Sequence, residues 1–432
     1  MDKLEDLIII SVDDHVSEPG NLFDNHLPDE LKSKAPQLKN VSGKDFWVFG
    51  DIVLPNVGLN AVVGRPKEEY GMEPQSYAEI RPANYDINAR IDDMNVNGIL
   101  SSLCFPTLCG MDGSIFSRNP DRTLSLRMIQ AYNDWQIDEW SVAHPGRIIP
   151  LSVVPLWDGA LAAEEVKRIA KKGCHAITFP DNPAKKGFAS VHDPMWEPLW
   201  QACNDNRVVV NCHIGTGSEP PHPSDMSPMN AWITAMPISI ANAAADWLHL
   251  AALLRYPNLK IALSEGSIGW IPYFLERAEF TNTQHIWTNV KWEGKTPSQV
   301  FREHFLCCFI EDNFGLKNYQ DIGEDIIAYE CDYPHSDCLW PEVPERLWQS
   351  VKELPERVIN KVTHENVMRE YSFDPISLLG RENCTVGALR AQAKHVDIQV
   401  KATPGLKPGD SNKVITSGDV QRMFASMAQT QK

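Results

Sequence analysis

The stretch LIIISVDDHVSEP, residues 7–19, begins as a buried strand and ends in charged side chains. Charged groups at the point where a core strand leaves its sheet are costly unless they have a partner. Side chains i and i+2 of a strand point to one face, so Asp13 and His15 are placed to share a ligand. A bound metal ion suits a carboxylate and an imidazole best. The same alternation points Asp14 away, where we expect it to cap or to face solvent.

The rest of the chain repeats this strand pattern. Seven further apolar runs follow, and amphipathic helical patterns separate most of them. We expect these strands within residues 97–106, 147–156, 173–180, 207–215, 259–267, 303–312 and 325–334. Nearly continuous apolar strands that alternate with helices are typical of an all-parallel sheet, and eight such units close most economically into a barrel. The sequence therefore predicts an α/β fold, a (β/α)8 TIM barrel.

Two segments lie outside the repeat. The Gly- and Pro-rich segment at about residues 40–85 alternates like a small hairpin, and we expect it to be a cap-like insertion over the barrel mouth. Residues 383–432 have few aromatic side chains and weak periodicity. We predict a metal-dependent barrel over residues 1–382 and, after it, a C-terminal arm or tail packed on the barrel or on a neighbouring subunit.

Composition excludes several classes of function. The chain has 432 residues, with 40 basic against 57 acidic side chains and a net charge of −17, which argues against nucleic acid or an anionic membrane as partner. The N-terminal MDKLEDLIII carries acids where a signal peptide has a basic region, and no run is long and apolar enough to span a bilayer, so a soluble cytoplasmic protein is expected. Its 10 cysteines stand partly inside apolar runs and form no CxxC pair, which favours buried thiols over disulfides or structural zinc. No glycine-rich phosphate loop is present, so we expect no nucleotide cofactor.

The barrel prediction brings scattered polar residues together, because TIM-barrel active sites form at the carboxyl ends of the strands. The first strand ends in Asp13 and His15, the fifth in His213 and the eighth in Asp332. These side chains form a mixed nitrogen and oxygen set suited to zinc, manganese or iron. Further polar side chains follow the sixth, seventh and eighth strands: Glu265, Glu311, Asp312 and His335. Of these, Glu265 and His335 are expected to be close enough to join the set, whereas His175 on the fourth strand is expected to lie too deep in the barrel.

Four motifs in order resemble those of a known family. They are DDHVSEP at 13–19, VVVNCHIG at 208–215, SEGSIGWIPYFLERAE at 264–279 and YECDYPHSDCLWP at 329–341. They look like the amidohydrolase-related branch of the amidohydrolase superfamily, and the likeness covers roughly residues 7–375. That branch contains metal-dependent hydrolases and the non-oxidative decarboxylases of aminocarboxymuconate semialdehyde and hydroxybenzoates.

The resemblance implies a role for each matching residue. Asp13 and His15 would bind a divalent metal, and His213 would be a third ligand. Asp332 would be a fourth ligand or the base that takes a proton from water, and His335 would bind a substrate carboxylate or steady Asp332. The implied reaction is hydrolysis of a small carboxylated or amide substrate by metal-activated water, or its metal-assisted decarboxylation.

Two departures from the family pattern keep alternatives open. Glu265 stands where the decarboxylases carry a histidine, and the fourth strand lacks the lysine that bridges two metals in some hydrolases. With Glu265 as a further ligand and catalytic candidate, the site has three carboxylates and three imidazoles, enough to hold two ions. An alternative is therefore a dinuclear iron or iron/manganese oxygenase, similar to the 2-aminoisobutyrate hydroxylase components. The chain would then be one subunit of a hetero-oligomer, active with its partner or without turnover of its own, whereas the hydrolase hypothesis also fits a homo-oligomer.

Overall fold

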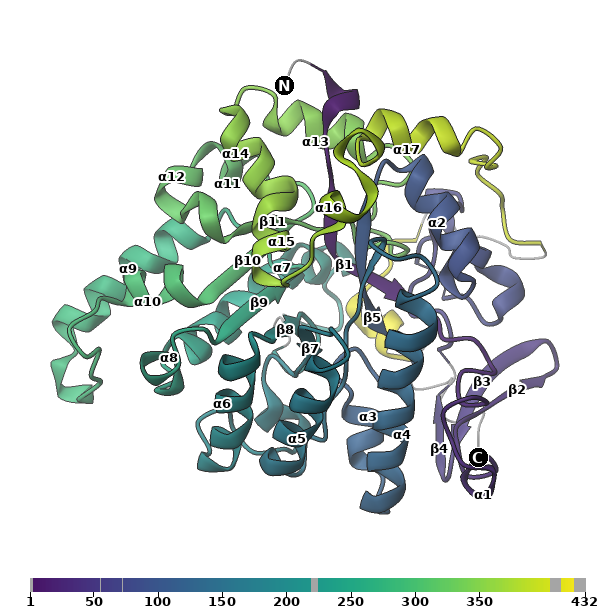
Figure 1. Ribbon diagram of the computed structural model, residues 1–432, viewed down its shortest axis with the longest axis horizontal. Helices are drawn as coiled ribbons and strands as arrows, with labels where there is room; N and C mark the ends of the chain where they lie inside the picture. The colour runs from purple at the N-terminus through teal and green to yellow at the C-terminus, as the bar shows by residue number, and fades with distance from the viewer. Residues whose placement is uncertain (1–2, 55, 72, 219–223, 405–412, 423–432) are drawn as a thin grey trace.

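Eight parallel strands form a closed barrel in the computed structural model, which describes residues 3–54, 56–71, 73–218, 224–404 and 413–422 (Figure 1). In chain order they are β1 (Ile10–Val16), β5 (Ser101–Pro106), β6 (Ile148–Ile149), β7 (Ala176–Thr178), β8 (Val209–His213), β9 (Lys260–Ser264), β10 (Phe305–Phe309) and β11 (Ile327–Tyr329). They pair in parallel as two sheets, β1-β5-β6 and β7-β8-β9-β10-β11. Two further parallel bridges, Ser152 with Ile177 and Asp14 with Tyr333, join the sheets at both edges. Each strand lies within a range that the sequence predicts.

Helices surround the barrel and connect its strands. The longer ones are α2 (Ile87–Val96), α4 (Arg122–Trp135), α5 (Gly159–Ala170), α6 (Glu197–Asn206), α7 (Met229–Leu248), α9 (Ile271–Gln284), α10 (Pro297–His304) and α13 (Val343–Val351). The shorter ones are α1 (Asp29–Lys32), α3 (Ser114–Arg118), α8 (Ala252–Arg255), α11 (Asn313–Lys317), α12 (Tyr319–Ile322), α14 (Glu356–Asn360), α15 (Asn366–Glu370), α16 (Pro375–Leu379) and α17 (Val386–Gln392). Asp86, Asp121 and Asp158 are the N-cap residues directly before α2, α4 and α5, where each carboxylate accepts hydrogen bonds from one or two backbone N–H groups of the first turn.

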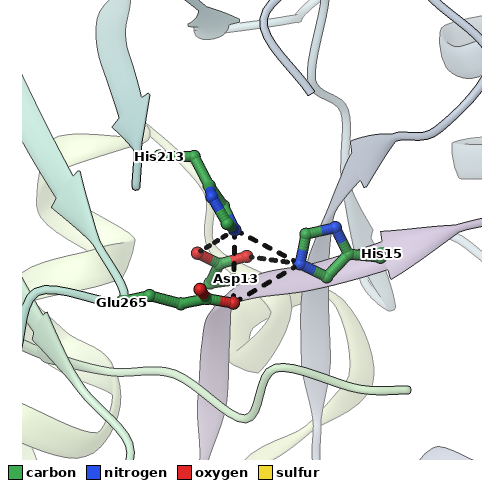
Figure 2. Close-up of side chains that lie close together, drawn as sticks. All are labelled: Asp13, His15, His213 and Glu265. Atoms are coloured by element: carbon green, nitrogen blue, oxygen red, sulfur yellow. Dashed lines mark hydrogen bonds and ion pairs between the residues drawn. The ribbon is translucent and has the colours of Figure 1, made fainter. Parts of the chain in front are cut away.

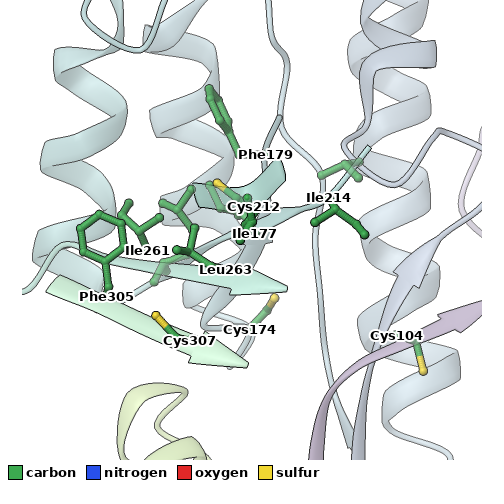
Figure 3. Packing of buried hydrophobic residues seen from close by; sticks show 14 of the residues in the cluster. Cys104, Cys174, Ile177, Phe179, Cys212, Ile214, Ile261, Leu263, Phe305 and Cys307 are labelled. Atoms are coloured by element: carbon green, nitrogen blue, oxygen red, sulfur yellow. The ribbon is translucent and has the colours of Figure 1, made fainter. Parts of the chain in front are cut away.

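Strand alternation divides the core into two layers. Ala262 of β9 faces the barrel interior, whereas Ile261 and Leu263 pack with the larger cluster between the strands and the helices (Figure 3). Large side chains such as Phe105, Leu306 and Tyr371 belong to the interior cluster together with small ones. All ten cysteines are buried and free of disulfides, as the sequence predicts.

The insertion forms a small antiparallel sheet of three strands, β2 (Gln37–Val41), β3 (Lys44–Phe49) and β4 (Ile52–Leu54), where a hairpin was expected. Downstream of it, the Val62 and Val63 N–H groups donate to the Pro334 carbonyl, 3.0 and 3.1 Å away, so this segment reaches the loop after β11.

The C-terminal arm runs along the barrel. The Val386 N–H donates to the Leu7 carbonyl at 2.8 Å, and the Lys401 N–H donates to the Gly64 carbonyl at 2.8 Å. Residues 55 and 72 of the predicted insertion, and 405–412 and 423–432 of the predicted arm, lie outside the described residues. The domain boundaries stay a prediction. Among the described helices, none combines the length and apolar character needed to cross a membrane.

Candidate metal centre

Six of the polar side chains expected at strand ends meet at the carboxyl mouth of the barrel. Asp13 and His15 lie near the end of β1, His213 is the last residue of β8, and Glu265 directly follows β9. Asp332 and His335 stand in the loop after β11. They form two overlapping groups, in which the ligand-type atoms lie within 4.8 Å of one another.

The first group contains Asp13, His15, His213 and Glu265, whose side chains point toward one another in Figure 2. The Nε2 atoms of His15 and His213 are 3.3 Å apart. His15 Nε2 lies 3.4 Å from Asp13 Oδ1, and His213 Nε2 lies 3.5 Å from Asp13 Oδ2. Glu265 Oε1 is 3.7 and 3.3 Å from the same two nitrogens. A single small cation between these atoms would be within reach of all four side chains.

The second group shares His15 and Glu265 with the first and adds Asp332 and His335. Asp332 Oδ1 lies 3.2 Å from His15 Nε2 and 2.8 Å from His335 Nδ1. His335 Nδ1 is also 3.8 Å from Glu265 Oε1, and its ring stacks on His15 with centroids 3.6 Å apart. His335 is therefore the partner of Asp332 within this group.

The donor atoms fit a divalent cation. Asp13 and His213 are buried, and the Glu265 side chain is only 14% exposed. Both Asp13 carboxylate oxygens, Glu265 Oε1 and Asp332 Oδ1 have no hydrogen-bond partner among the described residues. Buried carboxylate oxygens without donors are costly, and a cation bound by carboxylate and imidazole ligands would compensate them.

The pKa values of the site residues are shifted by burial and by the neighbouring charges. Burial raises the pKa of Asp13 well above its usual range, and the charge of Glu265 raises it further. Burial and then Glu265 raise the pKa of Asp332 in the same direction. Burial opposes the charged form of Glu265 as well, but His213 and the other imidazoles hold its pKa well below the usual range. Burial acts against protonation of His213, yet Glu265 and Asp13 raise its pKa to about 10. The cluster thus attracts positive charge.

Backbone contacts orient the candidate ligands. His213 Nδ1 lies 2.7 Å from the Ile214 carbonyl, which can only accept a hydrogen, so Nδ1 donates and Nε2 faces the cluster. The His15 N–H donates to the Tyr333 carbonyl, and the Asp332 N–H donates to the Asp13 carbonyl, both at 2.7 Å. These bonds fix the end of β1 against the loop after β11.

Asp14 differs from expectation. Its side chain does point away from the cluster, but it is buried and does not face solvent. Its carboxylate accepts hydrogen bonds from the Ser102 hydroxyl and, at 2.8 Å, from the Tyr333 N–H. The expectation was wrong because the far face of β1 is covered by neighbouring segments, including Arg90 of α2, which donates to the His15 carbonyl.

The other polar strand-end residues lie away from the site. Glu311 pairs with the exposed Arg346, with a shortest distance of 2.7 Å. Asp312 accepts hydrogen bonds from the Ile268 and Gly269 N–H groups and so anchors the loop that follows Glu265. His175 precedes β7, where its Nδ1 lies 3.0 Å from the Asn206 carbonyl, as expected for a residue too deep to reach the mouth.

Sequence reasoning missed Glu330. This acid directly follows β11, is fully buried, and accepts a hydrogen bond from the Glu265 N–H at 2.9 Å. The signal was present, because Glu330 stands at a strand end two residues before Asp332. The strand-end argument that selected Asp332 applies to Glu330 as well.

A protein-family model described as amidohydrolase matches residues 68–373. Similar solved structures include an amidohydrolase from Mycobacterium avium subsp. paratuberculosis K-10, with 21% identity and a TM-score of 0.66, covering 84% of this chain and 99% of that one. They also include 5-carboxyvanillate decarboxylase from Sphingomonas paucimobilis, with 19% identity and a TM-score of 0.57, covering 85% and 100%. The same enzyme from Novosphingobium aromaticivorans, complexed with manganese and 4-hydroxy-3-methoxy-5-nitrobenzoic acid, has 16% identity and a TM-score of 0.56, covering 84% and 96%. No curated protein matches the chain.

These comparisons bear on the fold and on part of the site. At such identities the structural likeness concerns the fold, and it agrees with the predicted α/β barrel. The family match includes His213, Glu265, Asp332 and His335 but begins after β1. The place of β1 in the site therefore rests on the geometry of Asp13 and His15.

Proposed function

Because this chain belongs to the amidohydrolase family, as its motifs predict, we propose that it is a metal-dependent enzyme that hydrolyses or decarboxylates a small carboxylated or amide substrate. One observation carries the proposal. Six side chains of metal-ligating type, from four strand ends, converge at the carboxyl mouth of the barrel, and some of their buried carboxylate oxygens have no hydrogen-bond donor. In this fold the mouth is where chemistry takes place.

The metal would be held first by Asp13, His15 and His213, with Glu265 completing the set. This mixture of carboxylate and imidazole ligands suits zinc, manganese and iron, and we propose that the ion is one of these three. The chemistry that such an ion supplies is acidification of water and polarisation of a substrate oxygen.

Asp332 and His335 would handle protons and substrate. Asp332 Oδ1 can accept a proton from water, and His335 Nδ1 at 2.8 Å keeps that carboxylate oriented. His335 Nε2 has no hydrogen-bond partner among the described residues. Because Nδ1 already faces the Asp332 carboxylate, we assign the ring with a hydrogen on both nitrogens to bind a carboxylate or carbonyl oxygen of the substrate, through Nε2.

The role of Glu265 distinguishes a site for one metal ion from a site for two, and with it the hydrolase or decarboxylase proposal from the oxygenase alternative. It belongs to both ligand groups, so its carboxylate is the natural bridge if two ions bind. No comparison supports the oxygenase alternative, since the similar structures described above are an amidohydrolase and decarboxylases. That alternative and the expected homo- or hetero-oligomer stay predictions.

The test is elemental analysis of protein purified without chelator, together with Asp13→Ala and Glu265→Ala variants shown by circular dichroism to be folded. About one ion per chain, lost in Asp13→Ala and retained with weaker affinity in Glu265→Ala, would support a mononuclear hydrolase or decarboxylase. The chelated protein, reloaded with zinc, manganese or iron, would then be assayed with amides, lactones and aromatic carboxylic acids for hydrolysis and release of carbon dioxide. A folded wild-type chain that retains no divalent ion and cannot be reloaded would refute the proposal.

A further inference from the structure

Glu330 is a buried acid that stands directly beneath the candidate site. Its side chain is fully buried at the end of β11. Oε2 accepts the hydrogen of the Glu265 N–H at 2.9 Å, whereas Oε1 has no hydrogen-bond partner among the described residues. No lysine, arginine or histidine of the described chain lies within ion-pair distance of it; the charges that act on it belong to the acids Asp13 and Glu265 and to the His213 imidazole. Its place is therefore not explained by an ion pair.

The backbone that Glu330 contacts is unusual. Glu265 has a φ of +56°, in the left-handed region that residues with a side chain rarely adopt. The chain makes this turn directly after Ser264, the last residue of β9, and the turn aims the Glu265 carboxylate at the imidazoles of both ligand groups. A residue in this conformation needs surrounding contacts to stay there.

The two ends of this turn are held by acids from the next two strands. At its start, Glu330 from β11 accepts from the Glu265 N–H. At its end, Asp312, which follows β10, accepts from the Ile268 and Gly269 N–H groups at 2.9 and 2.6 Å. Between them Gly266 lies so close to Ile240 that a Cβ atom there would be 2.4 Å from that side chain. The Glu330 contact is the one that acts on the candidate ligand itself.

We infer that Glu330 is a positioning residue, which holds the left-handed backbone of Glu265 through its side-chain oxygen and thereby presents the Glu265 carboxylate to the metal. The inference rests on the proposed function for the role of Glu265. Glu330 acts through an oxygen that lies close enough to accept the Glu265 N–H, and not through its negative charge. Loss of a hydrogen bond that orients a metal ligand typically lowers metal affinity 10- to 100-fold.

Two variants separate reach from charge. Glu330→Gln keeps an oxygen at the same distance and removes the charge, whereas Glu330→Asp keeps the charge and withdraws the oxygen by one methylene. Glu165→Gln is the control for removing a buried carboxylate charge away from the site: Glu165 accepts a hydrogen bond from Asn133 at 2.7 Å and pairs with Arg168 at 2.8 Å, but it lies on α5 outside the barrel. Manganese and cobalt affinities would be measured by titration against a chelating indicator, with circular dichroism as the check on folding.

We expect Glu330→Gln and the control to bind metal within about threefold of wild type, and Glu330→Asp to bind about 10- to 100-fold more weakly. Glu330→Asp with wild-type affinity, or Glu330→Gln weaker than Glu330→Asp, would overturn the inference. If Glu330→Asp does not fold, Glu330→Met, of similar volume to Glu and without an acceptor, takes its place with the same expected loss.

A metal-free measurement keeps this test separate from the proposed function. Hydrogen–deuterium exchange of the peptide that contains residues 264–269 would be followed in chelated protein. Glu330→Asp or Glu330→Met should speed amide hydrogen exchange in this peptide about tenfold or more, whereas Glu330→Gln should not. A wild-type protein that binds no metal refutes the proposed function, and the exchange result then still decides whether Glu330 holds the turn.

Discussion

The two ends of the barrel treat buried polar groups differently. At the amino ends, cationic side chains find oxygen acceptors. Arg147, just before β6, donates to the Leu100 carbonyl at 2.5 Å and to Asn95 Oδ1 at 2.7 Å. Lys260, the first residue of β9, donates to the Glu303 carbonyl at 2.7 Å. Such an end is built for stability.

At the carboxyl ends the pattern is reversed. Asp13, Glu265 and Asp332 are enclosed in the same barrel, yet both oxygens of Asp13 and one oxygen each of Glu265 and Asp332 have no hydrogen-bond partner among the described residues. Since crowded buried acids with unsatisfied oxygens destabilise the fold, their presence at this end indicates that it is kept for a ligand and is not optimised for stability. Substitutions at the carboxyl end should therefore change metal binding and activity, whereas substitutions at the amino end should change stability.

The largest expected effect is on catalysis at the mouth. Asp13→Asn should lower kcat/KM a thousandfold or more, about 4 kcal/mol of transition-state stabilisation, because a charged ligand is lost. The same variant should raise the Tm of the metal-free protein, since one of several crowded buried acids is removed. Steady-state kinetics and calorimetry on chelated protein test both, and a lower metal-free Tm would contradict the comparison.

A change at the other end should affect stability alone. Arg147→Met leaves the Leu100 carbonyl and Asn95 without their donor and should cost about 3 kcal/mol in the free energy of unfolding. Metal affinity should stay at the wild-type value, because Arg147 lies at the opposite end of the strands. Urea denaturation and a metal titration on the same preparation check this, and a large loss of metal affinity would mean that the two ends are not independent.

Metal loading should stabilise the mouth by mass action. At a free ion concentration of one hundred times Kd, the free energy of unfolding should rise by about 2.7 kcal/mol over the chelated protein. Arg147→Met should show the same rise, whereas Asp13→Asn should show almost none. Calorimetry with and without chelator measures the difference, and an equal rise in Asp13→Asn would place the binding site elsewhere.

The smallest effect concerns pH at the amino end. Burial, and then the nearby Arg381, lower the pKa of His364 from 6.5 to about 4, so the unfolded chain binds more protons than the folded one between these values. Stability contributed by neutral His364 is therefore complete above pH 6.5 and is lost as pH falls toward 4, by about 2 kcal/mol between pH 7.5 and 5. His364→Gln should flatten this part of the stability curve in urea denaturation, and an unchanged acid slope would assign the loss to other groups.

The sequence was sufficient for the barrel and for most of the site, because both follow from local patterns. Apolar runs separated by amphipathic helices locate the strands, and the strand-end rule selects Asp13, His213 and Asp332 without any knowledge of contacts. It did not predict the burial of Asp14, since Ser102 and the Tyr333 backbone that bind it come from distant parts of the chain. The bond from Glu265 to Glu330 is likewise tertiary, and no local pattern announces it.

The hydrogen bond from the Asp332 N–H to the Asp13 carbonyl joins the first barrel strand to the segment after the last one. During synthesis, Asp13 and His15 leave the ribosome more than three hundred residues before Asp332 and His335. A nascent chain therefore carries only His15 and Glu265 of the second ligand group until the segment after β11 is released. The contact that closes the barrel also completes that group. A chain truncated before β11 should therefore be unable to bind a metal ion with the full set of ligands.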